Sequence, residues 1–530
     1  MTAADTFDGL VADRAAAGGR TVLVREDGGA VDADAFDRMA GRAAAWLRGH
    51  GVGRGDRIAL WLDNRPEWLA ILFGAARLGA VVAAVNTRYR TAELQHILGS
   101  AGARMLVFGT DVAGLDWRAV MDGLDLAALP DLASFAAVGG GAPASAIGRP
   151  VVPFAPDGLD PLAAGGAGPD DPVLLFTTSG TTSVPKLVVH SQGSLVRHAR
   201  LCAASYGFDR DGAAYLAAMP FCGVFGLNPL LAAVVGGAPA RLQAAFDVDR
   251  AVSVGRDAAI THFFGSDEMF RRMWAADRTA FRTARLCGFA AFTPGLETAL
   301  LDMAEAGLPL AGVYGASEVN AIFAIQPSDM APSERLKGGG RPAAGGRASV
   351  RVRDGETGRL CPDGTVGMLE VRAETNFGGY FRNPEATATA VDAEGYFRTG
   401  DVGYRRGDGT FVYLARGGDV LRLSGFLTDP QEIEQVIEQA EGVAKAQVVG
   451  VAWEGRTRPV AFVTAAEGAA APEEGAIRAH AERMLAHYKV PLRVVVLPAF
   501  PTVESANGLK IQKARLRAMA SDLLAEEGGA

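Results

Sequence analysis

The sequence predicts an α/β protein in which a large N-terminal domain of βα-built sheets is joined by a hinge to a small α+β C-terminal domain. Three observations carry this prediction. Helix-like and strand-like segments alternate in the first part of the chain, the segments become shorter after residue 410, and the content of 49% hydrophobic and 21% charged residues is typical of globular proteins. A chain of 530 residues can also bury large cores without disulfides or metals.

Composition excludes several classes of function. The formal net charge of −8 leaves no electrostatic footprint for nucleic acid or an anionic membrane. No basic segment followed by an apolar run opens the chain, and no stretch reaches about 18 apolar residues, so neither a signal peptide nor a membrane span is expected. The cysteines are scattered without a CxxC pair, which argues against a zinc ribbon or a disulfide scaffold; they are Cys202, Cys222, Cys287 and Cys361. We therefore expect a cytoplasmic protein without a nucleic-acid partner.

Hydrophobic spacing assigns the first elements. Residues 31–50 are predicted to be a strand that leads into a helix, and residues 67–78 are predicted to be a second helix between the apolar strands 57–62 and 80–85. This alternation favours a largely parallel sheet. The segment 139–172 is rich in Gly, Pro and Ala, so we expect a surface connection that is neither helix nor strand, followed by a short strand at 173–176.

The C-terminal part is predicted from shorter units. A strand at 411–416 is followed by Gly-rich sequence, and a helix then begins near Pro430, with Thr428 or Asp429 as its cap. Two strands, a helix and a further strand follow. We place the domain boundary here, which gives a large domain at residues 1–415 and a small mobile domain at residues 416–530.

Residues 176–190, FTTSGTTSVPKLVVH, are the strongest chemical signal in the chain. Six hydroxyl residues occur among the seven positions 177–183, and they are followed by Lys186, one of six lysines among 52 basic residues. Small hydroxyls and backbone N–H groups can wrap phosphate oxygens, and a lysine adds a compact positive charge. The segment is not a Walker A loop, because Pro185 and Leu187 occupy positions that need Gly and Ser or Thr. A Ser/Thr-rich surface turn is the alternative, and the adjacent lysine favours phosphate binding.

Five motifs in order resemble those of the adenylate-forming enzymes, a family that includes acyl-CoA synthetases, adenylation domains of peptide synthetases and luciferases. FTTSGTTSVPK resembles the phosphate-binding signature of the family. VYGASE at 313–318, YFRTGD at 396–401, ARGGDVLRLSGFLTDPQEIE at 415–434 and NGLKIQKARLR at 507–517 resemble its later motifs. NTRYRTAEL near residue 90 extends the resemblance over nearly the whole chain, and the likeness is greatest to acyl-CoA ligases.

The resemblance implies a nucleotide site with Mg²⁺. Glu318 would hold the metal, Tyr314 would stack on adenine beside Ser317, and Asp401 and Arg416 would bind the ribose. Each of the four residues Tyr314, Glu318, Asp401 and Arg416 has an ordinary structural alternative, respectively a core aromatic, a carboxylate at a helix N-terminus, a turn cap and a surface arginine. The phosphates would be bound by Thr177, Thr178, Ser179, Gly180, Thr181, Thr182 and Lys186.

The resemblance also implies the chemistry. A carboxylate attacks the α-phosphate of ATP to give an acyl adenylate and pyrophosphate, and a thiol, usually that of CoA, then takes the acyl group. Lys510 would be carried into the site by rotation of the small domain and would neutralise charge during the reaction, whereas its alternative role is simple solvation. Gly418 would lie at the hinge, and Gly425 would let the pantetheine arm approach.

Several residues depart from the family pattern. Ser183 and Leu187 replace glycines that are usual there, and Gly418 replaces an Asp or Lys. Gly223 replaces a His or aromatic residue that normally gates the acyl pocket, so we expect an enlarged pocket for a bulky, hydrophobic acid, with Gly223 as a mere strand end the alternative. Asp267 and Glu268 stand where a Pro-containing pocket segment is common, which leaves Phe264 as the candidate there. The expected pocket residues are Gly223, Phe225, Phe264 and Gly315.

We therefore predict an acid:CoA ligase that uses ATP, Mg²⁺ and CoA. One alternative is a ligase that performs only the thioesterification of a preformed acyl adenylate. Others are a stand-alone adenylation domain, a luciferase-like oxygenase and a non-catalytic acyl- or nucleotide-binding protein. A peptide-synthetase domain is disfavoured because residues 220–228 lack the Asp that would pair a substrate amine. Family analogy alone suggests a homodimer, and the Arg-rich, Ala/Gly-rich composition fits both specialised metabolism and fatty-acid catabolism.

Overall fold

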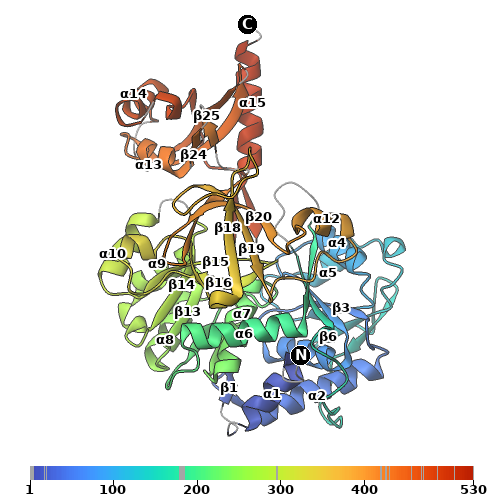
Figure 1. Cartoon of the computed structure of the whole chain (residues 1–530). Helices are drawn as coiled ribbons and strands as arrows, with labels where there is room; N and C mark the ends of the chain where they lie inside the picture. Colours follow the sequence, from blue (N-terminus) through green and yellow to red (C-terminus); the bar gives the residue numbers. More distant parts are fainter. Residues whose placement is uncertain are drawn as a thin grey trace.

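The computed structural model describes residues 5–16, 18, 21–177, 185–293, 296–417, 421–423, 426–428, 430–454, 456–466, 468, 471–485, 487–505 and 508–528. Within these residues, two large helix-covered sheets form the bulk of the molecule, and a small sheet with its own helices stands above them (Figure 1). This mixed α/β architecture, with a large N-terminal and a small C-terminal part, confirms the predicted fold class.

The first sheet is mostly parallel, as the alternation of helices and strands predicted. Its described strands run in the order β10-β9-β4-β3-β5-β6-β8-β7, with antiparallel pairing at β10–β9 and β7–β8. Their bounds are β3 Arg57–Trp61, β4 Val81–Ala84, β5 Met105–Gly109, β6 Ser134–Val138, β7 Ser145–Ala146, β8 Arg149–Pro153, β9 Pro172–Thr177 and β10 Leu187–Ser191. The helices of this region are α2 Ala33–Gly49, α3 Pro66–Leu78, α4 Thr91–Ala101 and α5 Trp117–Asp122, with a 3₁₀ turn at Leu126–Ala128.

The connection at 139–172 was predicted to contain neither helix nor strand, and this prediction is wrong. It holds β7 and β8, and β8 pairs in parallel with β6 through Phe135 and Val151. Val151 is buried, so one apolar side chain fixes the strand on the sheet. Pro150 and Pro153 are tolerated because the strand lies near the edge of the sheet, where fewer backbone donors are needed.

The second sheet changes from parallel to antiparallel at β15. The order of its described strands is β18-β19-β20-β21-β17-β16-β15-β14-β13-β11-β12-β1-β2. Pairing is parallel from β12 to β15 and antiparallel from β15 to β18. The bounds are β1 Thr21–Val24, β2 Ala30–Asp32, β11 Tyr215–Ala217, β12 Ala240–Leu242, β13 His262–Ser266, β14 Leu286–Ala290, β15 Leu310–Ala316, β16 Asn320–Ile325, β17 Gly339–Pro342, β18 Ala348–Arg353, β19 Gly367–Ala373, β20 Phe397–Arg405 and β21 Phe411–Arg416.

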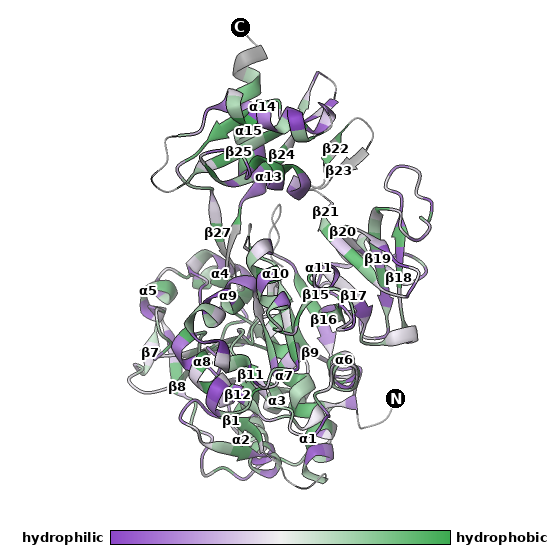
Figure 2. Ribbon diagram, turned by 90° about the vertical axis from the view of Figure 1, so that its left-hand side faces the viewer, coloured by the Kyte–Doolittle hydropathy of each residue, from purple (hydrophilic) through white to green (hydrophobic). Residues whose placement is uncertain are grey.

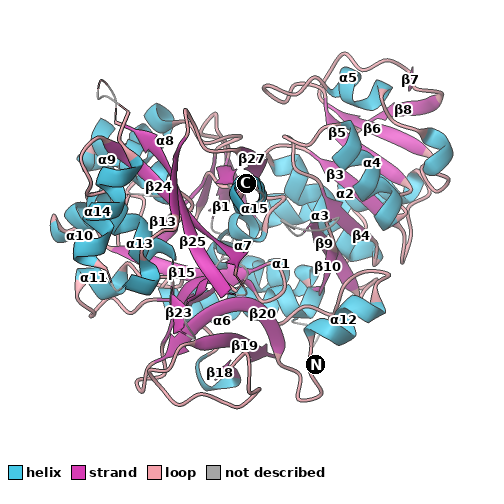
Figure 3. Ribbon diagram, turned by 90° about the horizontal axis from the view of Figure 1, so that it is seen from above, coloured by secondary structure: helices cyan, strands magenta, loops and turns pink. Residues whose placement is uncertain are grey.

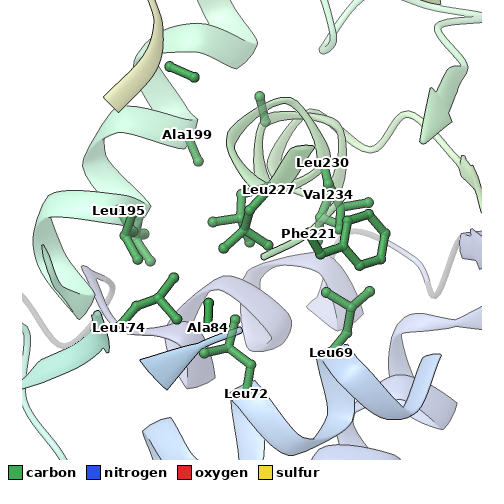
Figure 4. Close-up of a cluster of buried hydrophobic side chains, with 14 of the residues drawn as sticks. Leu69, Leu72, Ala84, Leu174, Leu195, Ala199, Phe221, Leu227, Leu230 and Val234 are labelled. Atoms are coloured by element: carbon green, nitrogen blue, oxygen red, sulfur yellow. The ribbon is translucent and has the colours of Figure 1, made fainter. Parts of the chain in front are cut away.

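The helices around this sheet include one that is buried on all sides. Figure 4 shows α7 seen end-on, with Leu227, Leu230 and Val234 packed among side chains of α3, α6, β4 and β9. An apolar helix without a polar face is typical of a protein core. Its first turn, which follows Gly223, is therefore held firmly. The bounds are α1 Phe7–Ala16, α6 Gln192–Tyr206, α7 Val224–Gly236, α8 Val248–Asp257, α9 Asp267–Ala276, α10 Glu297–Glu305, α11 Pro332–Arg335 and α12 Pro384–Ala390, with 3₁₀ turns at Arg278–Phe281 and Gly345–Arg347.

The C-terminal part has hydrophobic clusters of its own. Ile433 and Ile437 of α13 pack with Val448 on one face of the small sheet, and Leu516 and Leu524 of α15 pack on the other face. Figure 2 shows β27 extending from this part toward the large one, and Figure 3 shows the small sheet from above, over the large part. The bounds are β22 Leu421–Leu423, β23 Phe426–Thr428, α13 Pro430–Ile437, β24 Val443–Trp453, β25 Arg456–Ala465, α14 Glu474–Met484, a 3₁₀ turn at His487–Lys489, β26 Arg493–Val496, β27 Thr502–Ser505, β28 Gly508–Ile511 and α15 Lys513–Gly528. The boundary at residues 415 and 416 stays a prediction.

Among the described residues, no helix is long and apolar enough to cross a membrane. The four cysteines are all free, and their spacing in the sequence had argued against a disulfide scaffold.

Arg77 on α3 ties three segments of the large part together. Its guanidinium donates to Asp8 at 2.8 Å, to Asp37 at 2.5 Å and to the carbonyl of Leu162 at 2.7 Å, and its side chain is 3% exposed. We predict that Arg77→Ala lowers the free energy of unfolding by about 3 kcal/mol, because the change leaves Asp8 partly buried without its cation.

Denaturant unfolding followed by intrinsic fluorescence checks this prediction. Arg271→Ala is the control, because Arg271 makes an equally short ion pair with Glu268 on the exposed surface of α9. Equal losses of stability in the two variants would contradict the assignment of Arg77 as a buried anchor.

Candidate active site

Two pairs of strands that lie far apart in the sequence bring the predicted nucleotide-binding residues together. The β15–β16 hairpin carries Tyr314 and Glu318, whereas β20 and β21 carry Asp401 and Arg416. Asp401 and Arg416 are direct cross-strand partners, because the antiparallel register pairs them. Tyr314, Asp401 and Arg416 therefore meet where the second sheet changes from parallel to antiparallel pairing, and Glu318 lies near enough for the charges of Asp401 and Arg416 to affect its pKa.

Asp401 is the centre of this group. Its carboxylate accepts a hydrogen bond of 2.5 Å from the Tyr314 hydroxyl and lies 3.0 Å from the Arg416 guanidinium. Burial raises the pKa of Asp401, while Arg416 and Tyr314 act in the opposite direction. Arg416 also donates to the carbonyl of Thr399 at 2.7 Å, which orients its guanidinium beside the carboxylate. The result is a buried, ionisable acceptor that can receive hydroxyl donors from a ligand.

Asp401 is held in a strand, so the alternative of a turn cap is wrong. Gly400 has φ of +75°, which glycine adopts freely, and the backbone N–H of Asp401 donates to the Thr399 hydroxyl at 2.9 Å. The ring of Tyr314 packs edge-on against Phe411 at 5.1 Å, as expected for a core aromatic, while its hydroxyl binds Asp401; stacking of the ring on adenine stays a prediction.

Glu318 lies between β15 and β16 and is nearly buried. The alternative of a helix N-terminal carboxylate is therefore wrong. One carboxylate oxygen accepts a hydrogen bond of 2.8 Å from the Tyr380 hydroxyl, and the backbone N–H of Phe377 donates to the Glu318 carbonyl at 2.7 Å. Burial raises the pKa of Glu318, and the Tyr380 hydrogen bond opposes that rise.

Tyr380 was missed by the sequence analysis. The segment 377–381 pairs with β10, because Gly378 donates to the Val189 carbonyl at 2.8 Å and Val189 donates to that of Gly379 at 3.0 Å. The ammonium of Lys186 lies 4.8 Å from the centre of the Tyr380 ring. The residue that ends the predicted phosphate loop is thus placed beside the residue that holds Glu318. The signal in the sequence was the aromatic and glycine cluster FGGYF.

The predicted phosphate loop connects β9 to β10, which pair antiparallel at its base through Thr177 and Leu187. The Thr177 hydroxyl lies 3.3 Å from the hydroxyl of Tyr89. The remaining predicted loop residues lie outside the described part of the chain; they are Thr178, Ser179, Gly180, Thr181 and Thr182.

The donor set suits Mg²⁺ bound together with a phosphate ligand. Glu318 offers a hard carboxylate, and in the described part of the chain no group of three or more His, Cys, Asp or Glu residues could hold a metal by itself. Mg²⁺ commonly takes one or two protein carboxylates and completes its shell with phosphates and water.

The predicted acyl-pocket residues lie in different surroundings. The buried rings of Phe225 and Phe264 meet edge-on at 6.4 Å. A Cβ added at Gly223 would meet only the Pro220 carbonyl, at 3.7 Å, which is an ordinary van der Waals contact, so a small side chain would not clash with protein atoms there. A Cβ at Gly315 would lie 2.6 Å from the Ala321 backbone, so close packing of the hairpin requires glycine there.

The sequence analysis also missed Asn64, which holds the segment before Gly223. Its amide donates to the Met219 carbonyl at 2.8 Å and accepts from the Phe221 N–H at 2.8 Å. Asp267 fixes a neighbouring loop through the N–H groups of Phe292 and Thr293, at 3.1 and 2.8 Å. Asp267 is therefore engaged with protein backbone, which agrees with its omission from the predicted pocket.

The C-terminal predictions are only partly described. Lys510 lies in β28, which pairs with β27 through Val503, but its side chain is outside the described residues. Gly418 and Gly425 are also outside them. The backbone carbonyl of Ser317 lies 2.7 Å from a ring nitrogen of His190.

Comparison with known proteins identifies the class. The model of the family described as AMP-binding enzyme matches residues 11–381, and that of the AMP-binding enzyme C-terminal domain matches residues 432–507. The chain belongs to the AMP-binding enzymes, and the predicted membership of the adenylate-forming enzymes is confirmed.

The relatives extend over almost the whole chain. It is 30% identical to a 3-hydroxybenzoate--CoA ligase of Aromatoleum sp. (strain CIB), over 91% of this chain and 90% of the relative. It is 31% identical to a 3-[(3aS,4S,7aS)-7a-methyl-1,5-dioxo-octahydro-1H-inden-4-yl]propanoyl:CoA ligase of Mycobacterium tuberculosis, over 94% and 95%. ATP-bound MatB from Rhodopseudomonas palustris has the same fold, with a TM-score of 0.82 at 24% identity and coverage of 98% and 99%.

We predict that Tyr380→Phe shifts the acidic limb of the pH profile of kcat/KM for ATP to higher pH. The hydroxyl of Tyr380 stabilises the carboxylate form of Glu318 and so lowers its pKa, against the effect of burial. Its removal raises the pKa further, so a higher pH is needed to deprotonate Glu318 for metal binding.

Pyrophosphate release measured between pH 5 and 9 checks this shift. Tyr396→Phe is the matched control, because the Tyr396 hydroxyl bonds Ser349 at 2.8 Å and makes no contact with either carboxylate of the site. An unchanged acidic limb in Tyr380→Phe would show that Glu318 does not titrate in this profile.

Proposed function

We propose that this enzyme is an acid:CoA ligase that activates a bulky, hydrophobic carboxylic acid as its acyl adenylate and then transfers the acyl group to CoA. The observation that carries the proposal is the convergence of Asp401, Arg416, Tyr314 and Glu318 at one site. The near full-length similarity to acid–CoA ligases supports the same chemistry.

In the first half-reaction, a carboxylate oxygen of the acid attacks the α-phosphorus of ATP, and the bond to the β-phosphate oxygen breaks. Asp401 would accept the ribose hydroxyls, and Thr177, Lys186 and the loop 178–182 would bind the phosphates. Glu318 would hold Mg²⁺, which would neutralise charge on the phosphates as pyrophosphate leaves. No protein nucleophile is required, because position and charge neutralisation carry such a reaction.

Lys510 and the small domain would separate the two half-reactions. We propose that Lys510 neutralises the carboxylate and α-phosphate during adenylation and that the part of the chain after Gly418 then rotates about a hinge at this residue. Gly425 would face the pantetheine arm of CoA, whose thiol attacks the acyl carbon and displaces AMP. Cys222, although close to Gly223, is not a candidate nucleophile, because burial raises its pKa to about 12.

The acid would lie between Gly223, Phe225, Phe264 and Gly315. The two phenylalanine rings would supply an apolar wall, and Gly223 has no side chain that would take up space beside them. The named substrates of several relatives are aromatic or bicyclic acids, which fits such a pocket.

The direct test is pyrophosphate release with ATP and Mg²⁺ across small, fatty, aromatic and polycyclic acids, without CoA. We expect release with bulky aromatic or polycyclic acids. Release with none of them, together with thioester formation from a synthetic acyl adenylate and CoA, would instead support the thioesterification-only alternative.

Lys510→Ala separates the two half-reactions. We predict that it slows pyrophosphate release about 100-fold, since a charge that acts in the transition state is lost. Thioester formation from a supplied acyl adenylate should stay within about threefold of the wild type, on the same reasoning that the lysine is not used in that step. Lys513→Ala, three residues later, is the control, and similar slowing by both changes would contradict a specific role.

Gly223→Phe tests the pocket. We predict that KM rises for bulky acids and falls or stays constant for small ones, because the new ring would take up space that a large acid needs. The ratio of kcat/KM between a polycyclic acid and a small acid is the readout. A uniform effect on every acid would place Gly223 outside the pocket.

A further inference from the structure

The turn that carries Glu318 has a strained backbone. Asn320 has φ of +69° and Ile322 has φ of +51°, and both residues are fully buried. A β-branched residue rarely adopts the left-handed region, because its side chain crowds the backbone. Such a conformation persists only where the surrounding structure enforces it.

Side chains from β10 and α6 hold the carbonyl groups of this turn. Ring nitrogens of His190 and His198 lie 2.7 and 2.8 Å from the carbonyls of Ser317 and Ala321. Because carbonyls only accept, each ring must carry its proton on that nitrogen. Burial lowers the pKa of both histidines to about 4, so each is neutral near pH 7. The Tyr206 hydroxyl donates to the Ile322 carbonyl at 3.1 Å.

Two buried asparagines connect the turn to the helix that begins at the acid pocket. Asn228 of α7 accepts from the Ala321 N–H at 2.8 Å and donates to the Asn320 side-chain oxygen at 3.3 Å. The Asn320 amide in turn donates to the Thr375 carbonyl at 2.8 Å. The path continues along the chain to Phe377 and Tyr380, which bond the backbone and the carboxylate of Glu318.

Asn320 is not explained by its backbone alone. Glycine adopts φ of +69° without a steric penalty, so the conformation would favour glycine at this position. The asparagine side chain instead uses both its oxygen and its nitrogen in hydrogen bonds, in a place without solvent. A fully satisfied pair of buried amides fixes one arrangement of the groups that it joins.

We propose that Asn320 is a positioning residue that, through Asn228, fixes the Glu318 turn against α7 and so couples the acid pocket to the proposed metal-binding carboxylate. This proposal rests on the proposed function, in which Glu318 holds the metal of Mg·ATP. Gly223 and Phe225 lie at the start of α7, and Asn228 lies less than two turns further along the same helix. Occupation of the pocket and placement of Glu318 are thereby linked through one rigid element.

The test uses Asn320→Gly, which keeps the backbone conformation and removes only the side-chain amide. We expect the variant to fold with a wild-type circular dichroism spectrum. Its affinity for ATP with Mg²⁺, measured by titration calorimetry without acid, should fall about tenfold, as expected for two lost hydrogen bonds of ordinary strength. Its affinity for ATP in the presence of EDTA should not change. The fold decrease in kcat for adenylation should be larger than the fold increase in KM for the acid.

Three further variants keep the test decisive. Asn320→Asp also tolerates the left-handed region and keeps the oxygen that accepts from Asn228 but loses the donor to Thr375, so we expect a smaller loss of Mg·ATP affinity than in Asn320→Gly. Asn64→Ser is the matched control, because it removes two hydrogen bonds from the pocket segment but none from the Glu318 turn, and we expect it to raise the KM of the acid more than it lowers the affinity for Mg·ATP. If Asn320→Gly and Asn228→Ala act through one path, their effects on Mg·ATP affinity will not add in the double variant.

Different experimental results would contradict the positioning role of Asn320 and the proposed function. Wild-type Mg·ATP affinity and wild-type kcat in Asn320→Gly or Asn320→Asp would overturn the positioning role, even if the wild-type enzyme forms acyl adenylates. Absence of pyrophosphate release from the wild type with every acid would overturn the proposed adenylation, while the calorimetry would still measure the coupling to the metal.

Discussion

The burial of two carboxylates, Asp401 and Glu318, is the constraint on which the rest of the site depends. Removing a carboxylate from water is costly unless hydrogen bonds or a cation replace the lost solvation. Asp401 receives a tyrosine hydroxyl and a guanidinium, and Glu318 receives a tyrosine hydroxyl. Burial still raises the pKa of both carboxyl groups, so further hydroxyl donors or a cation would stabilise their ionised forms. A hydroxyl-rich ligand accompanied by a metal supplies both.

Residues from distant parts of the chain supply the hydrogen bonds and the cation that stabilise these buried carboxylates. Asp401 and Arg416 are paired by the register of β20 and β21, whereas Glu318 lies in the turn after β15. The segment 377–381 bonds β10 and the Glu318 turn at the same time, which joins the first sheet to the second. The helix α7 packs between the two sheets, and its N-terminal end lies at the proposed acid pocket. The proposed nucleotide and acid sites are thus joined by one connected set of elements.

Several elements of the fold and several candidate site residues could be predicted from the sequence, because the patterns that indicate them are local. The alternation of apolar runs gave β3, α3 and β4 nearly to the residue, and the order of short motifs selected Glu318, Asp401 and Arg416 before any geometry was known. The strands β7 and β8 were missed, because strands of two and five residues next to prolines carry little periodicity. Tyr380, Asn64, Asn228 and Asn320 were missed for another reason. Their roles arise from hydrogen bonds to residues 55 to 157 positions away, and no local pattern encodes such partners.

We propose that Asp401 and Glu318 are the two carboxylates that receive ATP and its metal. The decisive measurement is a crystal structure of the wild-type enzyme with ATP and Mg²⁺. We expect ribose hydroxyls within about 3 Å of the Asp401 carboxylate and a metal ion at about 2.1 Å from a Glu318 oxygen that also binds phosphate. Ribose bound elsewhere, or a metal held by the phosphates without Glu318, would contradict it.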